Sequence, residues 1–73
     1  MMYFPRLLDL RQDADKSQKE IAALLEIDQR TYSNYETGKR EIPVHFLIVL
    51  ADFYQTSIDY IVGRTDERLS SHF

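Results

Sequence analysis

Four polar side chains lie on one face of a candidate helix near the middle of the chain. Arginine can make paired hydrogen bonds to guanine, and the amides of glutamine and asparagine can make them to adenine. An ordinary solvated helix face, the simplest alternative, would more often carry glutamate and lysine, while Tyr32 and Tyr35 on the opposite face point toward a core. The pattern predicts that this face reads bases in a DNA groove. The four residues are Gln29, Arg30, Ser33 and Asn34.

Further side chains around this face are candidates for contacts with DNA phosphates. Gln18 opens the preceding helix, where free amide groups and the helix dipole attract an anion. Lys39 and Arg40 follow a turn at Gly38, where their charge can equally complement the dipole at the end of the helix. Phosphate contacts set affinity and register without reading sequence. The candidates from this reasoning are Ser17, Gln18, Lys19, Lys39 and Arg40.

The distribution of charge favours a nucleic-acid partner despite an acidic total. The 73 residues carry a net charge of −3, but residues 29–40 carry Arg30, Lys39 and Arg40 against Glu36, a local charge of +2. With 44% hydrophobic and 29% charged residues, the chain has the composition of one small globular domain. We therefore expect a single domain over residues 1–73, with a short tail at 64–73.

Several function classes are excluded by residue types that the sequence lacks. Cysteine is absent, so neither a disulfide nor a cysteine-zinc site can form, which is compatible with a reducing cytoplasm. His45 and His72 lie far apart and no nucleophile motif is present, so we expect no metal, no cofactor and no enzyme activity. The longest apolar run, Phe46 to Ala51, is too short to cross a membrane, and the N-terminus does not resemble a signal peptide.

Helical periodicity and capping residues predict five helices. Ser17 and Glu20 form the S-x-x-E pattern of a capping box, in which each side chain satisfies a backbone amide of the other residue. Both prolines are expected at the first position of a helix, where the missing N–H costs nothing, and glycines at 38 and 63 end two of the helices. The helices are expected to begin at about Pro5, Ser17, Asp28, Pro43 and Ser57. The positions expected to face the core are Leu7, Leu10, Ile21, Ala22, Leu25, Ile27, Tyr32, Tyr35, Phe46, Leu47, Leu50, Ala51, Tyr54, Ile58 and Ile61.

Only about three residues separate the second and third predicted helices, which indicates a helix-turn-helix at about 17–37. The stretch LRQDADKSQKEIAALLEIDQRTYSNYETGKREIP resembles the lambda-repressor-like, Cro/XRE family of helix-turn-helix regulators, and LADFYQTSIDYIVGRTD resembles the last two helices of its small bacterial members. The resemblance covers about residues 6–66 and implies an all-α, compact five-helix domain whose third helix enters the major groove. The matching elements are Ser17-Gln18, Glu20-Ile21-Ala22, Tyr35-Glu36-x-Gly38 and Pro43.

The resemblance also implies roles for individual side chains. It assigns base reading to Gln29, Arg30 and Asn34, with Ser33 as a fourth, and phosphate binding to Gln18. It implies that Arg11 and Glu36 form a structural salt bridge between the first and third helices. The residues that match backbone-contact positions are Ser17, Thr37, Lys39 and Arg40.

Two residues depart from the pattern of the family. Glu26 stands at the corner where relatives usually carry glycine, so we expect either strain of roughly 1–3 kcal/mol at a positive φ or a rearranged turn. Lys16 stands where relatives often carry an apolar residue that packs on Ile21, and its aliphatic stem could partly replace that contact.

These features lead us to expect a sequence-specific double-stranded-DNA-binding transcriptional regulator, a repressor, located in the cytoplasm with the nucleoid. One such module contacts about 600–1,000 Å², so tight binding requires a homodimer on two half-sites. The alternative is an antitoxin or a protein-interaction adaptor that binds DNA weakly or not at all, for which the net charge of −3 and the aromatic residues near the C-terminus argue. The dimer patch is expected to contain Phe53, Tyr54, Ile58, Tyr60, Ile61 and Val62.

Overall fold

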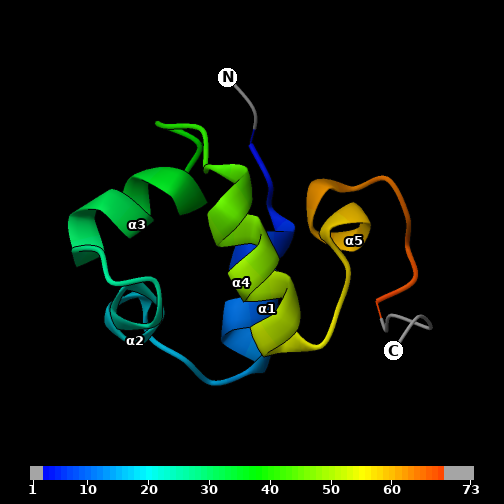
Figure 1. The fold of residues 1–73 in the computed structure, drawn as a ribbon, viewed down its shortest axis with the longest axis horizontal. Coiled ribbons are helices and arrows are strands. Elements are labelled where there is room, and N and C mark those ends of the chain that lie inside the picture. Colours follow the sequence, from blue (N-terminus) through cyan, green and yellow to red (C-terminus); the bar gives the residue numbers. More distant parts are fainter. Residues whose placement is uncertain (1–2, 69–73) are drawn as a thin grey trace.

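The computed structural model describes residues 3–68, which form five α-helices and contain no strand (Figure 1). In the view of Figure 1, α4 crosses in front of α1, with α2 and α3 to one side and α5 to the other. The expected all-α, five-helix fold is therefore confirmed. The helices are α1 (Arg6–Asp13), α2 (Gln18–Leu24), α3 (Gln29–Glu36), α4 (Val44–Tyr54) and α5 (Ile58–Val62).

Polar side chains cap three of the helices at the positions that the sequence indicated. The hydroxyl of Ser17 accepts a hydrogen bond from the Glu20 amide (3.0 Å), and the Ser17 amide donates to Glu20 Oε1 (2.9 Å), so the capping box is present. Asp28 and Ser57 cap α3 and α5 in the same way. The two prolines differ from expectation, because each lies one position before its helix, at the N-cap.

Among residues 3–68, five adopt a left-handed backbone, and two of these five are glycine. Gly38 (φ 82°) and Gly63 (φ 90°) end α3 and α5 as predicted. Glu26 has a φ of 59°, so the corner between α2 and α3 keeps the left-handed geometry with a strained residue instead of rearranging. Asp15 and Gln55 also have positive φ, and no pattern in the sequence indicated either.

The core is one cluster to which every helix contributes. Tyr32, like the leucines and isoleucines around it, is fully buried. Phe4 and Ile42 join the cluster from segments outside the helices and were not expected there. Five predicted core residues are only half-buried and pack against the outside of the cluster: Ile27, Tyr35, Phe46, Tyr54 and Ile58.

The segment after α5 returns along α1. The guanidinium of Arg6 donates to the carbonyl of Tyr60 (2.8 Å) and pairs with Asp66, and it lies 4.1 Å from the centre of the Tyr60 ring. Arg68 pairs with Asp13 at the other end of α1 (2.6 Å). Residues 64–68 of the predicted tail are therefore attached to the fold, and residues 69–73 lie outside the described part.

One residue of the predicted dimer patch needs correction. Ile61 is 1% exposed and belongs to the core, so a second subunit cannot contact it. Tyr60 and the other members on α5 are half-buried, because a helix of five residues uses most of its apolar surface to close the fold. Only Phe53 among the six is fully at the surface.

Candidate nucleic-acid interface

The corner between α2 and α3 sets the direction of α3. The amide of Glu26 donates to the carbonyl of Ala23 (3.1 Å), and the amide of Ile27 donates to the carbonyl of Ala22 (3.0 Å). These two bonds close the end of α2 on a left-handed residue, a common way to satisfy terminal carbonyls. Leu25 is buried and Ile27 packs on the core, so apolar contacts also hold the short link in place. The outer side of α3 is left open.

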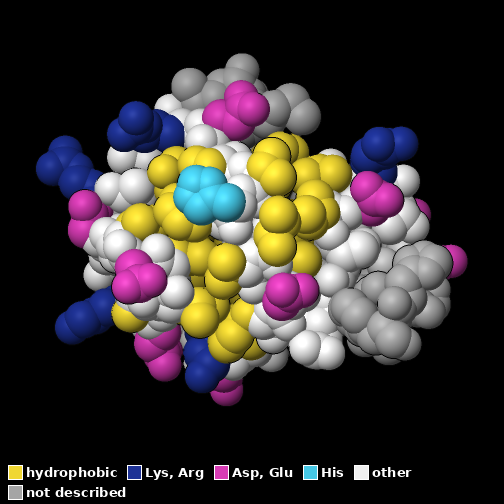
Figure 2. Space-filling model, in the orientation of Figure 1, with side chains coloured by type: hydrophobic (Ala, Val, Ile, Leu, Met, Phe, Trp, Pro, Cys, Tyr) yellow, Lys and Arg dark blue, Asp and Glu magenta, His cyan; other side chains and the backbone are white. Residues whose placement is uncertain are grey.

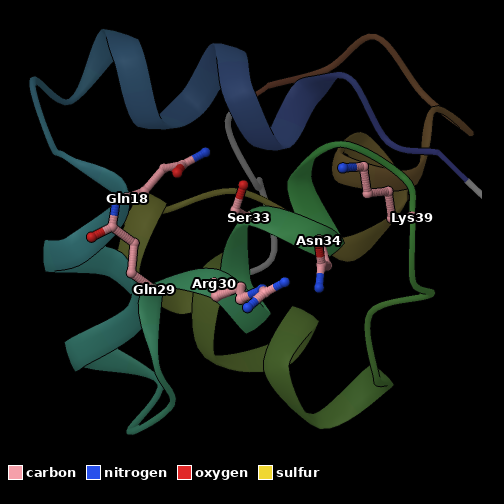
Figure 3. A pocket seen from close by; sticks show the side chains of 6 residues that line it. All are labelled: Gln18, Gln29, Arg30, Ser33, Asn34 and Lys39. Carbon is pink, nitrogen blue, oxygen red and sulfur yellow. The ribbon is translucent and has the colours of Figure 1, made fainter.

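Six of the predicted DNA-contact residues line one open hollow of about 500 Å³ (Figure 3). Figure 3 shows side chains from α2, from α3 and from the loop after α3 around a common space, with Gln18 and Gln29 at one end and Lys39 at the other. Gln29 and Arg30 are exposed, while Ser33 and Asn34 are half-buried nearer the floor. The hollow is thus lined by side chains that can form hydrogen bonds. Two of these side chains are also positively charged, one as an ammonium and one as a guanidinium group.

The other four predicted phosphate ligands lie outside this hollow but remain at the surface. The Thr37 hydroxyl donates to the carbonyl of Ser33 (2.8 Å), and the Ser17 hydroxyl accepts from the Glu20 amide, so both are already used within the chain. Lys19 and Arg40 are exposed and flank the hollow on the α2 side and the loop side. The predicted DNA-contact residues therefore form two groups, the six that line the hollow and the four that lie around it.

The loop after α3 is anchored so that Lys39 stays beside the hollow. The amide of Arg40 donates back to the carbonyl of Asn34 (3.1 Å), and Ile42 is buried. The left-handed Gly38 lies under Tyr3, and a Cβ on that glycine would be 3.1 Å from the Tyr3 side chain. A larger residue at position 38 would therefore meet both backbone strain and a crowded neighbour.

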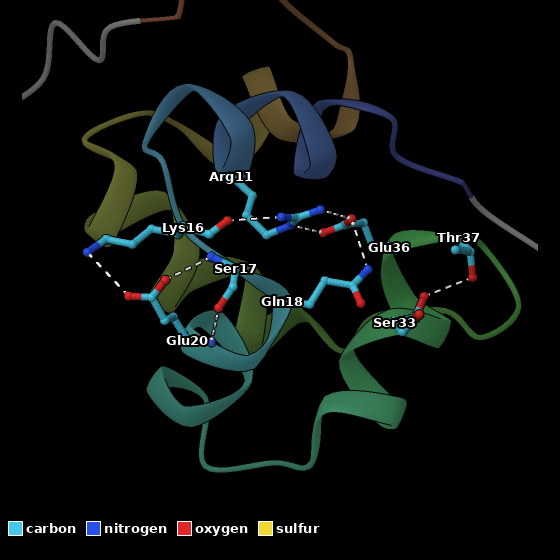
Figure 4. A network of polar contacts seen from close by, with 8 residues as sticks. All are labelled: Arg11, Lys16, Ser17, Gln18, Glu20, Ser33, Glu36 and Thr37. Atoms are coloured by element: carbon cyan, nitrogen blue, oxygen red, sulfur yellow. Dashed lines mark hydrogen bonds and ion pairs between the residues drawn. The ribbon is translucent and has the colours of Figure 1, made fainter.

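Beneath the hollow lies an ion pair that joins three segments of the chain (Figure 4). Arg11 on α1 makes a two-bond contact with Glu36 on α3, with Nε to Oε2 at 2.8 Å and Nη2 to Oε1 at 2.9 Å. Its third nitrogen, Nη1, donates to the carbonyl of Lys16 just before α2 (2.9 Å). The Glu36 side chain is only 4% exposed. Arg11 therefore fixes the ends of α1, α2 and α3 relative to one another.

Gln18 has a second role that the sequence did not reveal. Its Nε2 donates to Glu36 Oε1 (3.2 Å), so one amide proton serves the ion pair. The same side chain lines the hollow, where its carbonyl oxygen and second amide proton can still bind a ligand. Gln18 thus connects the buried pair to the open surface.

The environment of this network keeps its ion pair charged. Burial tends to raise the pKa of Glu36, but the hydrogen bonds from Arg11 and Gln18 outweigh it and hold the pKa below the ordinary value. The hydrogen bond to Glu36 likewise raises the pKa of Arg11. Burial raises the pKa of Tyr32 and brings that of Tyr54 to about 12, so both phenols stay neutral. Their hydroxyls find no hydrogen-bond partner within residues 3–68.

No group of three histidine, cysteine or carboxylate side chains in the described residues could hold a metal ion. None of the described helices is long and apolar enough to cross a membrane.

Two short helices that meet at a left-handed corner, with a polar outer side on the second, define a helix-turn-helix protein. A helix-turn-helix family model (HTH_3) matches residues 7–61. The chain therefore belongs to the helix-turn-helix family, in its Cro/C1 type. The resemblance seen in the sequence is confirmed.

Curated proteins of Bacillus subtilis (strain 168) are similar to most of the chain. The uncharacterized HTH-type transcriptional regulator YobD is 35% identical over 66 residues, which are 90% of this chain and 59% of that protein. The HTH-type transcriptional regulator AnsR is 36% identical over 67 residues, 92% of this chain and 58% of that protein. ImmR, also an HTH-type transcriptional regulator, is 38% identical over 61 residues, 84% of this chain and 48% of that protein.

The chain thus spans about half the length of the curated relatives it matches. No solved structure gives a significant match. Because the family and these relatives are regulators with a helix-turn-helix, the expectation that the chain is not an enzyme is confirmed.

Proposed function

We propose that this chain is a sequence-specific double-stranded-DNA-binding transcriptional regulator that reads the major groove with α3. The observation that carries the proposal is the hollow in Figure 3, where hydrogen-bonding tips from α2, α3 and the following loop converge on an open surface. The major groove is about 12 Å wide and admits an α-helix. The printed names of the relatives, all HTH-type transcriptional regulators, support the same conclusion.

The side chains divide the work by position. Gln29, Arg30, Ser33 and Asn34 on α3 read base edges, because they stand on the side of the helix that the chain leaves open. Gln18 and Lys39 bind phosphates at the two ends of the hollow. The flanking surface contributes further phosphate contacts from Ser17, Lys19, Thr37 and Arg40.

The proposed regulator acts in the cytoplasm on the nucleoid, as a repressor that occupies an operator. It binds as a homodimer on two half-sites about one helical turn apart. A single module of this size makes too small an interface for tight binding, whereas two copies on one duplex combine their contacts.

Selection of bound sequences from a random duplex pool tests the proposal. The expected result is one enriched motif with two related half-sites, lost when Arg30 and Asn34 are both replaced by alanine. The matched control is Glu41→Ala, a change at an exposed residue outside the hollow. Recovery of random sequence from the wild-type chain would exclude sequence-specific binding.

A second candidate function is an antitoxin or adaptor that binds a protein partner. Two observations favour it: the net charge of −3 and the hydrophobic side chains exposed on α4. A salt-dependent mobility shift of mixed duplex DNA separates the two functions. A pure adaptor gives no shift at low salt, whereas the proposed regulator gives one that weakens steeply as salt rises.

A further inference from the structure

Helix α4 is apolar on two sides. Its inner side contributes Leu47, Leu50 and Ala51 to the core. Its outer side faces the viewer in Figure 2, where hydrophobic side chains gather over α4. Val44 is 64% exposed and Ile48 is 48% exposed, values that burial in the core would not allow. We call this side the outer α4 face, made of the exposed residues Val44, His45, Ile48, Val49, Asp52 and Phe53.

The outer α4 face carries its two polar residues in a symmetric arrangement. His45 precedes the midpoint between Ile48 and Val49 by as many positions as Asp52 follows it. A separation of seven residues is about two helical turns, so both lie on one side of α4, about 10 Å apart. A second α4 placed antiparallel across that midpoint sets each histidine opposite an aspartate. The face is therefore complementary to itself in hydrogen bonding, because an imidazole N–H can donate to a carboxylate oxygen, and it is apolar between these two residues.

We propose that a second copy of this chain covers the outer α4 face, with the two α4 helices antiparallel about a two-fold axis between Ile48 and Val49. In a two-fold interface each subunit uses the same patch, so a patch must fit its own rotated copy. His45 then meets Asp52 of the partner subunit, twice per dimer. The isoleucines and valines at the axis lose contact with water, which supplies the driving force.

This arrangement also suits two reading helices on one duplex, a point that rests on the proposed function. In Figure 1, α2 and α3 lie together on one side of α4. A two-fold axis that crosses α4 toward that side carries both α2–α3 pairs to the same side of the dimer. Parallel pairing of the α4 helices would place the two pairs on opposite sides, where one straight duplex cannot reach both. The antiparallel pair is therefore the one that fits two half-sites.

Sedimentation equilibrium of the full chain tests the interface directly. The wild-type chain is expected to dimerise in the micromolar range, and Ile48→Glu to weaken the dimer by about a hundredfold, because both copies bring the charge to the axis. Circular dichroism melting at a protein concentration well below the dimer dissociation constant should remain unchanged, since Ile48 is 48% exposed in the single chain and only the dimer adds concentration-dependent stability. Tyr3→Glu is the matched control, because Tyr3 is an exposed hydrophobic residue outside α4, and it should leave the dimer intact.

A charge exchange tests the antiparallel register. His45→Glu alone sets two carboxylates opposite each other and should weaken the dimer by about tenfold. The double change His45→Glu and Asp52→Lys restores opposite charges across the axis and should return the dissociation constant to near the wild-type value. Failure of the double change to rescue the dimer would overturn the register. A wild-type chain that stays monomeric at about 100 µM would overturn the interface and leave the face to another protein.

DNA binding separates this inference from the proposed function. With a duplex that holds one half-site, Ile48→Glu should bind as well as the wild-type chain, and with two half-sites it should bind about tenfold or more weakly. If Ile48→Glu abolishes the dimer but no variant binds any duplex, the interface stands and the proposed function fails. If Ile48→Glu dimerises and binds both duplexes like the wild-type chain, the interface is wrong and the proposed function stands.

Discussion

The open side of α3 and the outer α4 face use their surface residues in opposite ways. On α3 the exposed side chains are amides, a hydroxyl and a guanidinium, and beneath them lies the buried ion pair of Arg11 with Glu36. On α4 the exposed side chains are mainly apolar, and beneath them lies the apolar core. Hydrogen bonds to a ligand depend on direction, whereas apolar contact does not. The open side of α3, which must orient its hydrogen-bonding groups toward a ligand, is therefore the side that rests on a directional ion pair.

We therefore expect substitutions in the ion pair beneath α3 to destabilise the fold far more than substitutions on the outer α4 face. Glu36→Ala leaves Arg11 in a site where only 15% of its side chain is exposed, without its partner. We expect the free energy of unfolding to fall by about 3–5 kcal/mol, measured by urea denaturation. On the other side, Val44→Ala should change it by less than about 0.5 kcal/mol, because Val44 is largely solvated.

A double variant shows whether the loss comes from the stranded charge. Replacing Arg11 by Met together with Glu36 by Leu removes both charges and should cost less than Glu36→Ala alone. A double variant at least as unstable as the single one would mean that the pair itself, and not the unpaired arginine, carries the stability.

Low pH should destabilise the fold by weakening the ion pair beneath α3. The pKa of Glu36 is lower in the folded chain than in the unfolded chain, where carboxylates titrate near pH 4. The stabilisation is therefore complete above the unfolded pKa and is lost as the pH falls through the folded pKa. We expect the midpoint of urea unfolding to fall as the pH is lowered below about 4. The midpoint of a Glu36→Gln variant should depend less on pH. An equal slope in both proteins would contradict this assignment.

Arg30→Ala should affect binding and leave stability unchanged. Arg30 is exposed on the open side of α3 and supports no buried contact, so its loss should cost about 1–3 kcal/mol of binding and relax the preference at one base pair. Titration of specific and random duplexes by fluorescence anisotropy measures both effects. Lys39→Ala is the contrasting change, which should weaken all duplexes alike and reduce the salt slope by about one. Equal losses on specific and random DNA for Arg30→Ala would remove it from the base-reading set.

Glu26→Gly should give a small change, in the direction of greater stability. Glycine adopts the φ of 59° at this corner without the steric cost that glutamate bears, but it also loses more freedom on folding. The two effects leave a gain of about 1 kcal/mol or less. Thermal unfolding followed by circular dichroism would detect it, with Gln55→Gly on the α4 side as the matched test of another left-handed corner.

The local features of the fold could be predicted because they depend on neighbours in sequence. The capping box of Ser17 with Glu20 needs only four consecutive residues, and the stop at Gly38 needs only one. The position of the polar face on α3 follows from helical periodicity in the same way. These features fixed which side chains could reach a ligand, and the structure brings six of them to one hollow.

Features that join distant segments could not be predicted in this way. Arg6 binds residues 54 or more positions away, and no local pattern connects them. The left-handed residues Asp15 and Gln55 were also missed, because neither is a glycine, the residue type that usually indicates such a backbone. Ile61 was wrongly assigned to the dimer patch for a related reason, since periodicity alone does not say how much apolar surface α5 contributes to the core.

The hydrogen bond from Gln18 to Glu36 suggests how substitutions far from the DNA could change the sequence that such a domain prefers. Gln18, which binds DNA in the proposed function, shares the acceptor Glu36 Oε1 with Arg11 of α1, which is not among the proposed DNA contacts. An altered residue on α1 can therefore tilt the end of α2 and shift which operators are preferred. Searches for altered specificity that mutate only the helix in the groove would miss this class of variant.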